Sequence, residues 1–327
     1  MTDRKRVFSG IQPTGDIHIG NYLGALRNYV RLQEDYDTIY CVVDMHAITV
    51  PYDPAELQRA RLSTAKILLA VGVDPRRSML YYQSQVPQHA ELSWILGTVT
   101  GLGQLNRMTQ FKEKADRVGQ SLGIYAYPVL MAADILIHKV HAVPVGDDQS
   151  QHLELTRDLV QRFNSRYGEE FPLPEQITPE VGARVMSLTD PTAKMAKSDP
   201  DPDSRILLTD EPDEVRRKLR GAVTDSGRDI TYDPQEKAGV ANLLDIFSGF
   251  TGRSIEDLVG DYYEGGYGRF KEGVAEAVVE GLTPIRKAYK ELDDQEVARI
   301  MAKGALDART GAEQTMASVR RRVGLSG

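Results

Sequence analysis

A glycine-rich turn near the start of the chain could hold a phosphate group. The segment from Ser9 to Tyr22 contains three glycines and one proline, and it follows the short apolar run Val7-Phe8. A turn of this kind between a strand and a helix directs backbone N–H groups and a helix N-terminus at an anion. The imidazole of His18, two residues before Gly20, would add a hydrogen-bond donor. A tight turn with a satisfied histidine is the alternative for this segment alone.

A second segment, Lys194-Met195-Ala196-Lys197-Ser198, lies far downstream in a turn-rich region. It follows Asp190-Pro191 and precedes Asp199-Pro200-Asp201-Pro202, and such dipeptides are typical of loops. Two lysines three residues apart, followed by a hydroxyl group, suit a mobile clamp on a triphosphate. Their ammonium groups can neutralise the charge that develops on a pyrophosphate leaving group. Taken alone, a lysine-rich pentapeptide is more often a solvated surface loop.

The two segments together resemble the signatures of the class I aminoacyl-tRNA synthetases, which normally are His-Ile-Gly-His and Lys-Met-Ser-Lys-Ser. Here the residues are His18-Ile19-Gly20-Asn21 and Lys194 to Ser198. Ala196 stands where the second signature usually has its first serine. Losing that hydroxyl group would cost one hydrogen bond, about 1 kcal/mol, and would leave both clamping charges. We therefore expect an active enzyme.

Further segments narrow the resemblance to the bacterial tryptophanyl-tRNA synthetases. Past about residue 250 the similarity is mainly one of length and helical character. The resemblance implies activation of L-tryptophan with ATP and Mg²⁺ to tryptophanyl-adenylate and pyrophosphate, then transfer of tryptophan to the terminal ribose of tRNA(Trp). It also implies a homodimer. The segments that carry it are Phe8-Ser9-Gly10-Ile11-Gln12-Pro13, His46-Ala47-Ile48-Thr49, Arg107-Met108-Thr109-Gln110-Phe111-Lys112, Met131-Ala132-Ala133-Asp134, Gly146-Asp147-Asp148-Gln149, Gly182-Ala183-Arg184-Val185-Met186-Ser187 and Ala222-Val223-Thr224-Asp225-Ser226.

Amino-acid activation needs no covalent nucleophile, because the protein has to position two anions and absorb the charge of the transition state. The resemblance places ATP on the first turn, on a turn after a later strand, and on the strand-like residues 183–186 that lead to the lysine loop. Asp148 would hold the ribose hydroxyl groups. The catalytic residues would be His18, Lys194, Lys197 and Ser198. The ATP-binding residues would be Gln12, Pro13, Thr14, Gly20, Asn21, Gly146, Asp147, Asp148, Val185, Lys194, Met195, Ala196, Lys197 and Ser198.

Asp134 is the most informative side chain for the amino-acid site, since the surrounding residues 130–137 are otherwise apolar. A buried carboxylate is costly unless it accepts hydrogen bonds, and an indole offers one N–H donor. An aspartate that bridges to a neighbouring helix is the alternative, and the resemblance favours recognition of the indole nitrogen. Tyr127 and Gln149 would hold the ammonium and carboxylate groups, and His46 would support the site. The tryptophan-binding residues would be Phe8, His46, Tyr127, Met131, Asp134, Val143, Val145 and Gln149.

The elements that must position these residues alternate as in an α/β protein. Apolar runs predict strands over 7–9, 38–43, 78–82 and 141–145, and helical periodicity predicts helices over 22–33, 53–71 and 148–167. We therefore expect a Rossmann-type parallel sheet as a nucleotide-binding catalytic domain over residues 1–205. Residues 206–327 would form an all-helical domain. By the resemblance, that domain binds the anticodon of the tRNA, and the mostly helical insertion at about 87–140 builds the dimer interface.

The composition of the chain excludes several kinds of site and segment. Cys41 is the single cysteine of the chain, which excludes an internal disulfide and a cysteine-rich zinc or iron–sulfur site. We expect no protein-ligated metal. No apolar run approaches the length of a membrane span, and the N-terminal residues have no signal-peptide core. A reducing cytoplasm fits these features.

Net charge gives no support to a polyanionic partner. The chain carries −7, and residues 206–327 contain 18 basic against 22 acidic residues. Binding of nucleic acid depends on local patches, so an acidic total does not exclude it. Candidate patches are Arg216-Arg217-Lys218 with Arg220, and Arg320-Arg321-Arg322. Solvated helix faces balanced by nearby carboxylates are an equal alternative for each.

Three other functions stay open at this point. A tyrosyl-tRNA synthetase would share the fold and mechanism. Another nucleotidyltransferase with a similar histidine turn would make a small-molecule adenylate. A non-catalytic paralogue would keep the fold as a binding protein, and only Ala196 favours that interpretation.

Overall fold

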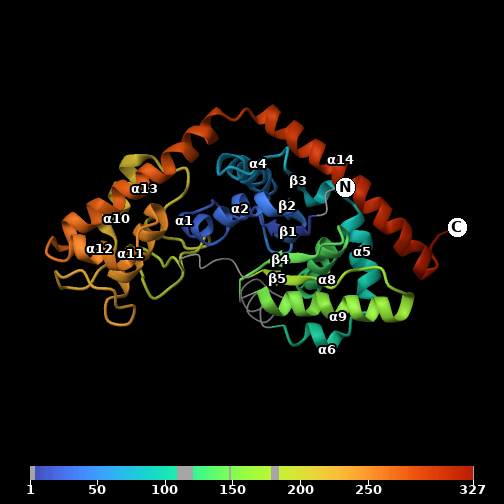
Figure 1. Cartoon of the computed structure of the whole chain (residues 1–327). Helices are drawn as coiled ribbons and strands as arrows, with labels where there is room; N and C mark the ends of the chain where they lie inside the picture. Colours follow the sequence, from blue (N-terminus) through green and yellow to red (C-terminus); the bar gives the residue numbers. More distant parts are fainter. Residues whose placement is uncertain (1–3, 109–120, 147–148, 178–183, 327) are drawn as a thin grey trace.

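A five-stranded parallel sheet forms the centre of the molecule (Figure 1). The computed structural model describes residues 4–108, 121–146, 149–177 and 184–326. The strands lie in the order β3-β2-β1-β4-β5, so β1 is central and β3 and β5 are the edges. Their bounds are β1 Arg6–Ile11, β2 Asp37–Val42, β3 Ser78–Tyr82, β4 Ala142–Pro144 and β5 Glu175–Ile177. The parallel α/β fold predicted from the sequence is thereby confirmed.

The first helical stretch begins earlier than predicted. It starts with α1 (Ile19–Asn21), continues through a π-helical turn (Tyr22–Leu26) and ends with α2 (Arg27–Asp35). A π-helical turn widens the helix locally and is often found beside functional sites. The predicted helix over 22–33 therefore lies within a longer and less regular element.

Helices α3 to α9 complete the sheet-forming part. Asp53 caps α4 as its sequence suggests, because its side chain accepts a hydrogen bond from the Glu56 N–H. Gly168 has φ +90° directly after α9, a conformation that favours glycine. The bounds are α3 Asp44–Ala47, α4 Pro54–Ala70, α5 Gln88–Gly97, α6 Leu102–Leu105, α8 Leu122–Leu136 and α9 Ser150–Tyr167, with 3₁₀ turns at Gln83–Gln85 and Pro202–Ser204.

Residues after 205 form five helices in the described part of the chain: α10 (Pro212–Gly221), α11 (Ala238–Thr251), α12 (Ile255–Tyr262), α13 (Gly266–Glu291) and α14 (Asp294–Val323). Helices α10 to α13 pack together on one side of the sheet, as Figure 1 shows. The long α14 instead returns along the sheet and packs against β3, α4 and α5. The predicted division at residue 205 stays a prediction, and the last helix packs against elements that precede residue 205.

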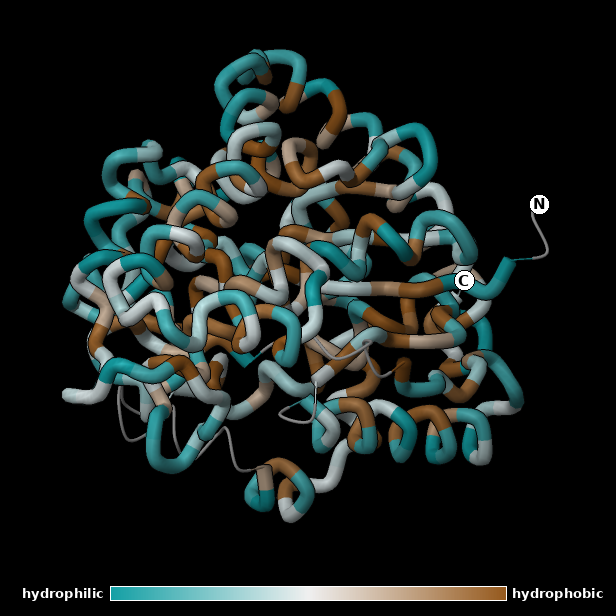
Figure 2. The backbone as a smooth tube through the Cα atoms, turned by 60° about the vertical axis from the view of Figure 1, so that its left-hand side comes forward, coloured by the Kyte–Doolittle hydropathy of each residue, from teal (hydrophilic) through white to brown (hydrophobic). Residues whose placement is uncertain are grey.

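A glycine permits the close approach of α14. A Cβ atom at Gly304 would overlap the backbone carbonyl of Leu80 in β3, so a larger residue cannot occupy this position without moving the helix. Buried side chains form two clusters on opposite faces of the sheet, one with Tyr82 and one with Tyr81. Helix α14 contributes residues to both clusters. In Figure 2 many of the hydrophobic segments, drawn in brown, accordingly lie toward the middle of the molecule.

Candidate active site

A cavity of about 470 Å³ is lined by residues in and directly after β1 and β4, by residues that follow β2, and by residues of α8. In open parallel sheets, ligands bind at the carboxyl ends of the strands, where the strand order changes direction. All eight residues predicted to bind tryptophan line this cavity. The full lining is Phe8, Ser9, Gly10, Gln12, Tyr29, Val43, His46, Tyr127, Met131, Asp134, Ile135, Val143, Pro144, Val145, Gly146 and Gln149.

The carboxylate of Asp134 is buried on the wall of this cavity, with 1% of its surface exposed. Its Oδ2 lies 2.8 Å from Nε2 of His46. The amide of Gln83 donates to both carboxylate oxygens, at 2.7 and 2.9 Å, and Nδ1 of His89 lies 2.8 Å from Oδ1. The sequence allowed two roles for Asp134, in substrate recognition or as a bridge to a neighbouring helix. Its position is compatible with both, since Asp134 lines the cavity and also links α8 to neighbouring elements.

These contacts keep Asp134 ionised. Burial alone would raise the pKa of its carboxyl group, but the hydrogen bonds from His46 and His89 outweigh burial and lower the pKa to about 2. An ionised carboxylate only accepts hydrogen bonds, so a substrate group that approaches it must be a donor.

Tyr127 is held by a histidine that the sequence analysis did not select. Its hydroxyl group lies 2.8 Å from Nε2 of His152, which is buried in α9. The ring of Tyr127 also meets the ring of His46 edge-on, with 6.2 Å between the centroids. Tyr127 thus has a fixed orientation at the cavity wall.

The glycine-rich turn is stabilised by backbone pairing with a distant segment. The N–H of Ile19 donates to the carbonyl of Ile206 at 2.9 Å, and the N–H of Leu208 donates to the carbonyl of Ile17 at 3.0 Å. Oδ1 of Asn21 accepts from the N–H of His18 at 3.2 Å. The expectation that this helix N-terminus offers its N–H groups to an anion therefore does not hold for Ile19, whose N–H is already used.

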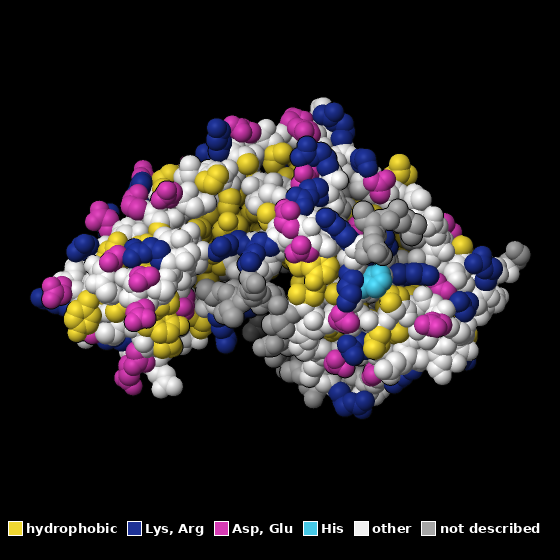
Figure 3. Space-filling view, in the orientation of Figure 1, with side chains coloured by type: hydrophobic (Ala, Val, Ile, Leu, Met, Phe, Trp, Pro, Cys, Tyr) yellow, Lys and Arg dark blue, Asp and Glu magenta, His cyan; other side chains and the backbone are white. Residues whose placement is uncertain are grey.

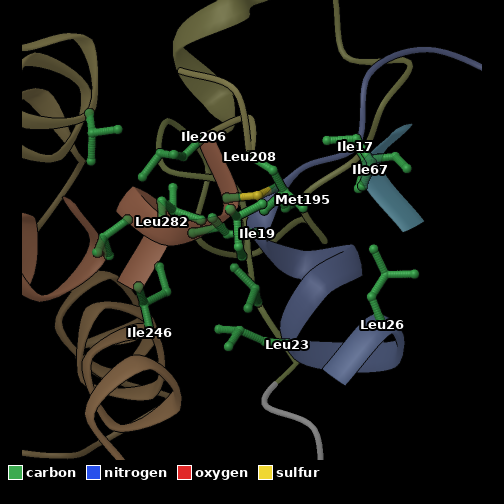
Figure 4. Close-up of a cluster of buried hydrophobic side chains, with 14 of the residues drawn as sticks. Ile17, Ile19, Leu23, Leu26, Ile67, Met195, Ile206, Leu208, Ile246 and Leu282 are labelled. Carbon is green, nitrogen blue, oxygen red and sulfur yellow. The ribbon is translucent and has the colours of Figure 1, made fainter. Parts of the chain in front are cut away.

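The lysine loop is anchored by its methionine. Met195 is buried, and it lies beside Ile19 and Leu208 in the larger hydrophobic cluster (Figure 4). The preceding residues form a short hairpin, in which the N–H of Met195 donates to the carbonyl of Val185 at 3.2 Å. Lys194 and Ser198 are exposed, whereas Lys197 is half-buried. The apolar anchor thus holds the two lysines near the glycine-rich turn.

His18 and Lys197 affect one another's electrostatic surroundings. Burial, followed by the positive charges of Lys197, Arg205 and Lys194, lowers the pKa of His18 to about 4. Burial also lowers the pKa of Lys197 to about 8, and the carboxylate of Asp16 opposes this only in part. The two signatures that are far apart in the sequence therefore meet, and His18 is neutral at pH 7.

Several of the predicted ATP-binding residues lie in two cavities and at the contact between the glycine-rich turn and Val185. Gln12 and Gly146 line the cavity just described, and Pro13 and Thr14 line a neighbouring cavity of about 490 Å³. A Cβ atom at Gly20 would lie 3.5 Å from Cβ of Val185, so these two residues are in contact range. Asp147 and Asp148 lie outside the described residues.

Sequence reasoning missed several residues at this site. Gln83 and His89 contact Asp134 from segments that carried no recognised motif. Gln83 directly follows β3, and its place at the carboxyl end of a parallel strand was a usable signal. The cavity-lining residues that were not predicted are Ser9, Gly10, Tyr29, Val43, Ile135 and Pro144.

Both candidate basic patches are largely used in ion pairs. Arg216 pairs with Glu276 and Asp213, and Arg217 pairs with Asp203 and Glu214. Arg320 pairs with Glu91 and Glu313, and Arg322 pairs with Glu170. On the face shown in Figure 3, basic and acidic side chains are intermingled. The alternative of balanced helix faces describes these arginines better than a basic patch does.

Two further properties of the described residues bear on metals and membranes. Within residues 4–108, 121–146, 149–177 and 184–326, no group of three or more His, Cys, Asp or Glu side chains is arranged to hold a metal ion. None of the helices in the described part of the chain is long and apolar enough to cross a membrane.

Known proteins resemble the chain in sequence and in structure. The family model of tRNA synthetases class I (W and Y) matches residues 1–283. The tryptophan–tRNA ligase of Caldanaerobacter subterraneus subsp. tengcongensis is 51% identical over 322 residues, and that of Bacillus anthracis is 48% identical; each alignment covers 98% of both chains.

Solved structures of tryptophanyl-tRNA synthetases resemble the structure of this chain. The tryptophanyl-tRNA synthetase of Mycoplasma pneumoniae superposes with a TM-score of 0.89 at 34% identity, covering 99% of this chain and 98% of that one. The Campylobacter jejuni enzyme, solved with ADP and tryptophan, gives 0.86 at 35% identity and covers 98% of this chain and 100% of that one. The chain therefore belongs to the class I tRNA synthetases of the W and Y family.

Proposed function

We propose that this protein is a tryptophan–tRNA ligase, which activates L-tryptophan with ATP and transfers it to tRNA(Trp). The observation that carries the proposal is the cavity that contains the ionised Asp134 together with all the other residues predicted to bind tryptophan. The full-length identity of about half to the tryptophan–tRNA ligases of two bacteria supports the same substrate.

Asp134 would select the amino acid by its charge and its burial. As an acceptor-only group inside an apolar cavity, it would receive the indole N–H, while Phe8, Met131 and Val143 enclose the ring. A site built to hydrogen-bond a polar group of its substrate can reject analogues that lack this group by about 10⁴–10⁵-fold. Tyr127 and Gln149 line the same cavity and would hold the substrate's ammonium and carboxylate groups.

The ATP would lie between the glycine-rich turn and the lysine loop. The substrate carboxylate attacks the α-phosphorus, the bond to the β-phosphate oxygen breaks, and pyrophosphate leaves. Lys194 and Lys197 would neutralise the charge that develops on that leaving group, and neutral His18 would donate a hydrogen bond to a phosphate oxygen. Mg²⁺ would enter together with the ATP and help to neutralise the charge of its phosphates.

A second copy of the chain is the partner that fits the apolar groove formed by α5, α6 and α8. The groove has a volume of about 830 Å³, and its lining includes Trp94 and Leu122, each 79% exposed, and Leu102, 68% exposed. Exposed apolar side chains that gather in one groove can mark a site of protein–protein contact. Tyr127 lines both this groove and the amino-acid cavity, so dimer formation would support the active site directly.

The test is ATP–pyrophosphate exchange without tRNA, with tryptophan and tyrosine measured side by side. We expect exchange that depends strongly on tryptophan, with tyrosine supporting it far less well. Asp134→Asn should lose this selectivity more than it loses ATP affinity. Exchange with tyrosine would assign the chain to the other substrate of its family. Exchange with neither, in folded protein that binds ATP, would identify a non-catalytic paralogue.

A further inference from the structure

A line of buried polar side chains continues from Asp134 away from the cavity. Nε2 of His89 lies 2.9 Å from the hydroxyl group of Tyr81. The same hydroxyl group lies 2.7 Å from Nε2 of His138. His89, Tyr81 and Asp134 are at most 1% exposed, and His138 is 4% exposed. Neither His89, Tyr81 nor His138 lines the amino-acid cavity.

The donors around Asp134 come from two sides. His46 lines the cavity and contacts Oδ2, whereas Gln83 and His89 contact the carboxylate from positions outside the lining. Gln83 is itself fixed, because its Oε1 accepts from the backbone N–H of Met45 at 3.1 Å. Gln83 and His89, which lie outside the cavity lining, therefore set the plane of the carboxylate independently of the groups that contact it from the cavity.

The orientation of His89 is fixed by its second nitrogen. Nδ1 of His89 lies 2.8 Å from an oxygen of Asp134, and because an ionised carboxylate only accepts, this approach favours the tautomer that carries the proton on Nδ1. Its Nε2 meets the hydroxyl group of Tyr81, which can either donate or accept, and that hydroxyl group is held in turn by His138. Turning the His89 ring would lose both contacts in a buried site, which is costly.

We infer that Gln83, His89, Tyr81 and His138 are positioning residues for amino-acid selection: they hold the carboxylate of Asp134 in one orientation toward the cavity without touching the substrate. This inference rests on the proposed function, in which Asp134 receives the indole N–H. Selectivity for a ring that carries an N–H would thus depend on side chains behind the cavity wall.

The decisive variant is Tyr81→Phe, which removes one buried hydroxyl group and keeps the ring. The readout is the ratio of kcat/KM in pyrophosphate exchange for tryptophan and for its benzothiophene analogue, in which sulfur replaces the ring N–H. We expect Tyr81→Phe to lower this ratio about tenfold through the KM for tryptophan, because one orienting hydrogen bond is lost. The KM values for ATP and for the analogue should not change.

Tyr82→Phe is the matched control. Tyr82 is the next residue of the same strand, but it belongs to the cluster on the opposite face, and its hydroxyl group donates to the carbonyl of Arg61 at 3.3 Å. Its ratio should equal that of the wild type. At position 89, His89→Asn keeps an N–H near Asp134 and should retain more selectivity than His89→Leu.

The outcomes separate this inference from the proposal on which it rests. Absence of tryptophan-dependent exchange in the wild type overturns the proposed function and this inference with it. Exchange without discrimination against the analogue overturns the role of Asp134. Strong discrimination that is unchanged in folded Tyr81→Phe and His89→Leu overturns the inference alone, since a purely structural network would alter stability and leave the ratio intact.

Discussion

The side-chain amide of Asn242 forms two hydrogen bonds with the backbone of Met186. Its Oδ1 accepts from the Met186 N–H at 2.8 Å, and its Nδ2 donates to the Met186 carbonyl at 3.0 Å. Asn242 belongs to α11, and Met186 pairs with Lys194 in the hairpin that carries the lysine loop. The helical part of the molecule is therefore tied directly to the segment that would bind ATP.

Removal of this link should weaken ATP binding. Asn242→Ala leaves the partly buried N–H and carbonyl groups of Met186 without their partner, which costs about 1–3 kcal/mol of folding free energy. Because the hairpin then loses its fixed position, we expect the KM for ATP to rise about tenfold, with the KM for tryptophan unchanged. Urea unfolding and exchange kinetics with each substrate varied in turn would measure both effects. An unchanged KM for ATP would contradict this role of Asn242.

The charge of Lys197 should make ATP use depend on pH. Its pKa of about 8 lies below the ordinary value of 10.5, so the ammonium group is lost as the pH rises through about 8 in the free enzyme. We expect kcat/KM for ATP to fall above that pH, and Lys197→Arg should shift the fall to higher pH. Lys197→Ala should lose about 100-fold or more at pH 7, whereas Ala196→Ser should change little. The reverse pattern for these last two variants would contradict the assignment.

Two glycines of α14 should respond oppositely to the same substitution. Gly304→Ala forces the helix away from Leu80, and we expect a loss of about 1–3 kcal/mol in the free energy of unfolding. A Cβ atom added at Gly311 would meet no heavy atom of the described residues within 4 Å, so Gly311→Ala should be neutral or stabilise by up to about 1 kcal/mol. Thermal and urea unfolding of both variants would check this. Equal effects would show that α14 does not approach β3 so closely.

Trp94 can report on the proposed dimer, because it is the single tryptophan of the chain and lies in the apolar groove. We expect its emission to shift to longer wavelength on dilution, as the indole becomes exposed to water. Leu122→Glu should produce a monomer in sedimentation and reduce exchange activity. Leu306→Glu changes an exposed leucine of α14, 63% exposed, and should leave the dimer intact. A fully active monomer would contradict the proposal.

Local patterns were sufficient for much of the fold. The strand over 78–82 has the predicted bounds, and Asp53 and Gly168 mark helix ends as their side-chain chemistry suggests. The π-helical turn at Tyr22–Leu26 could not be predicted, since hydrophobic periodicity does not distinguish it from an α-helix. The return of α14 to the sheet likewise depends on contacts between residues far apart in the chain.

Some residues of the candidate site could be predicted from the sequence and others could not. Motifs were sufficient to select residues that line the cavity, because each motif carries its own chemistry. The partners of Asp134 and Tyr127 were missed, since His89, Gln83 and His152 come from other elements and stand in no characteristic spacing to them. The ion pairs of the arginine patches could not be predicted, because the pairing carboxylates, such as Glu276 and Glu170, are distant in sequence.

The position of α14 has a consequence for biosynthesis. Strand β3 is an edge of the sheet, and a strand edge with open N–H and C=O groups can pair with another chain. Helix α14 straddles that edge, but the ribosome makes it more than 200 residues after β3. Throughout that interval the nascent sheet has an uncovered edge, so the growing chain is most exposed to aggregation shortly before α14 emerges.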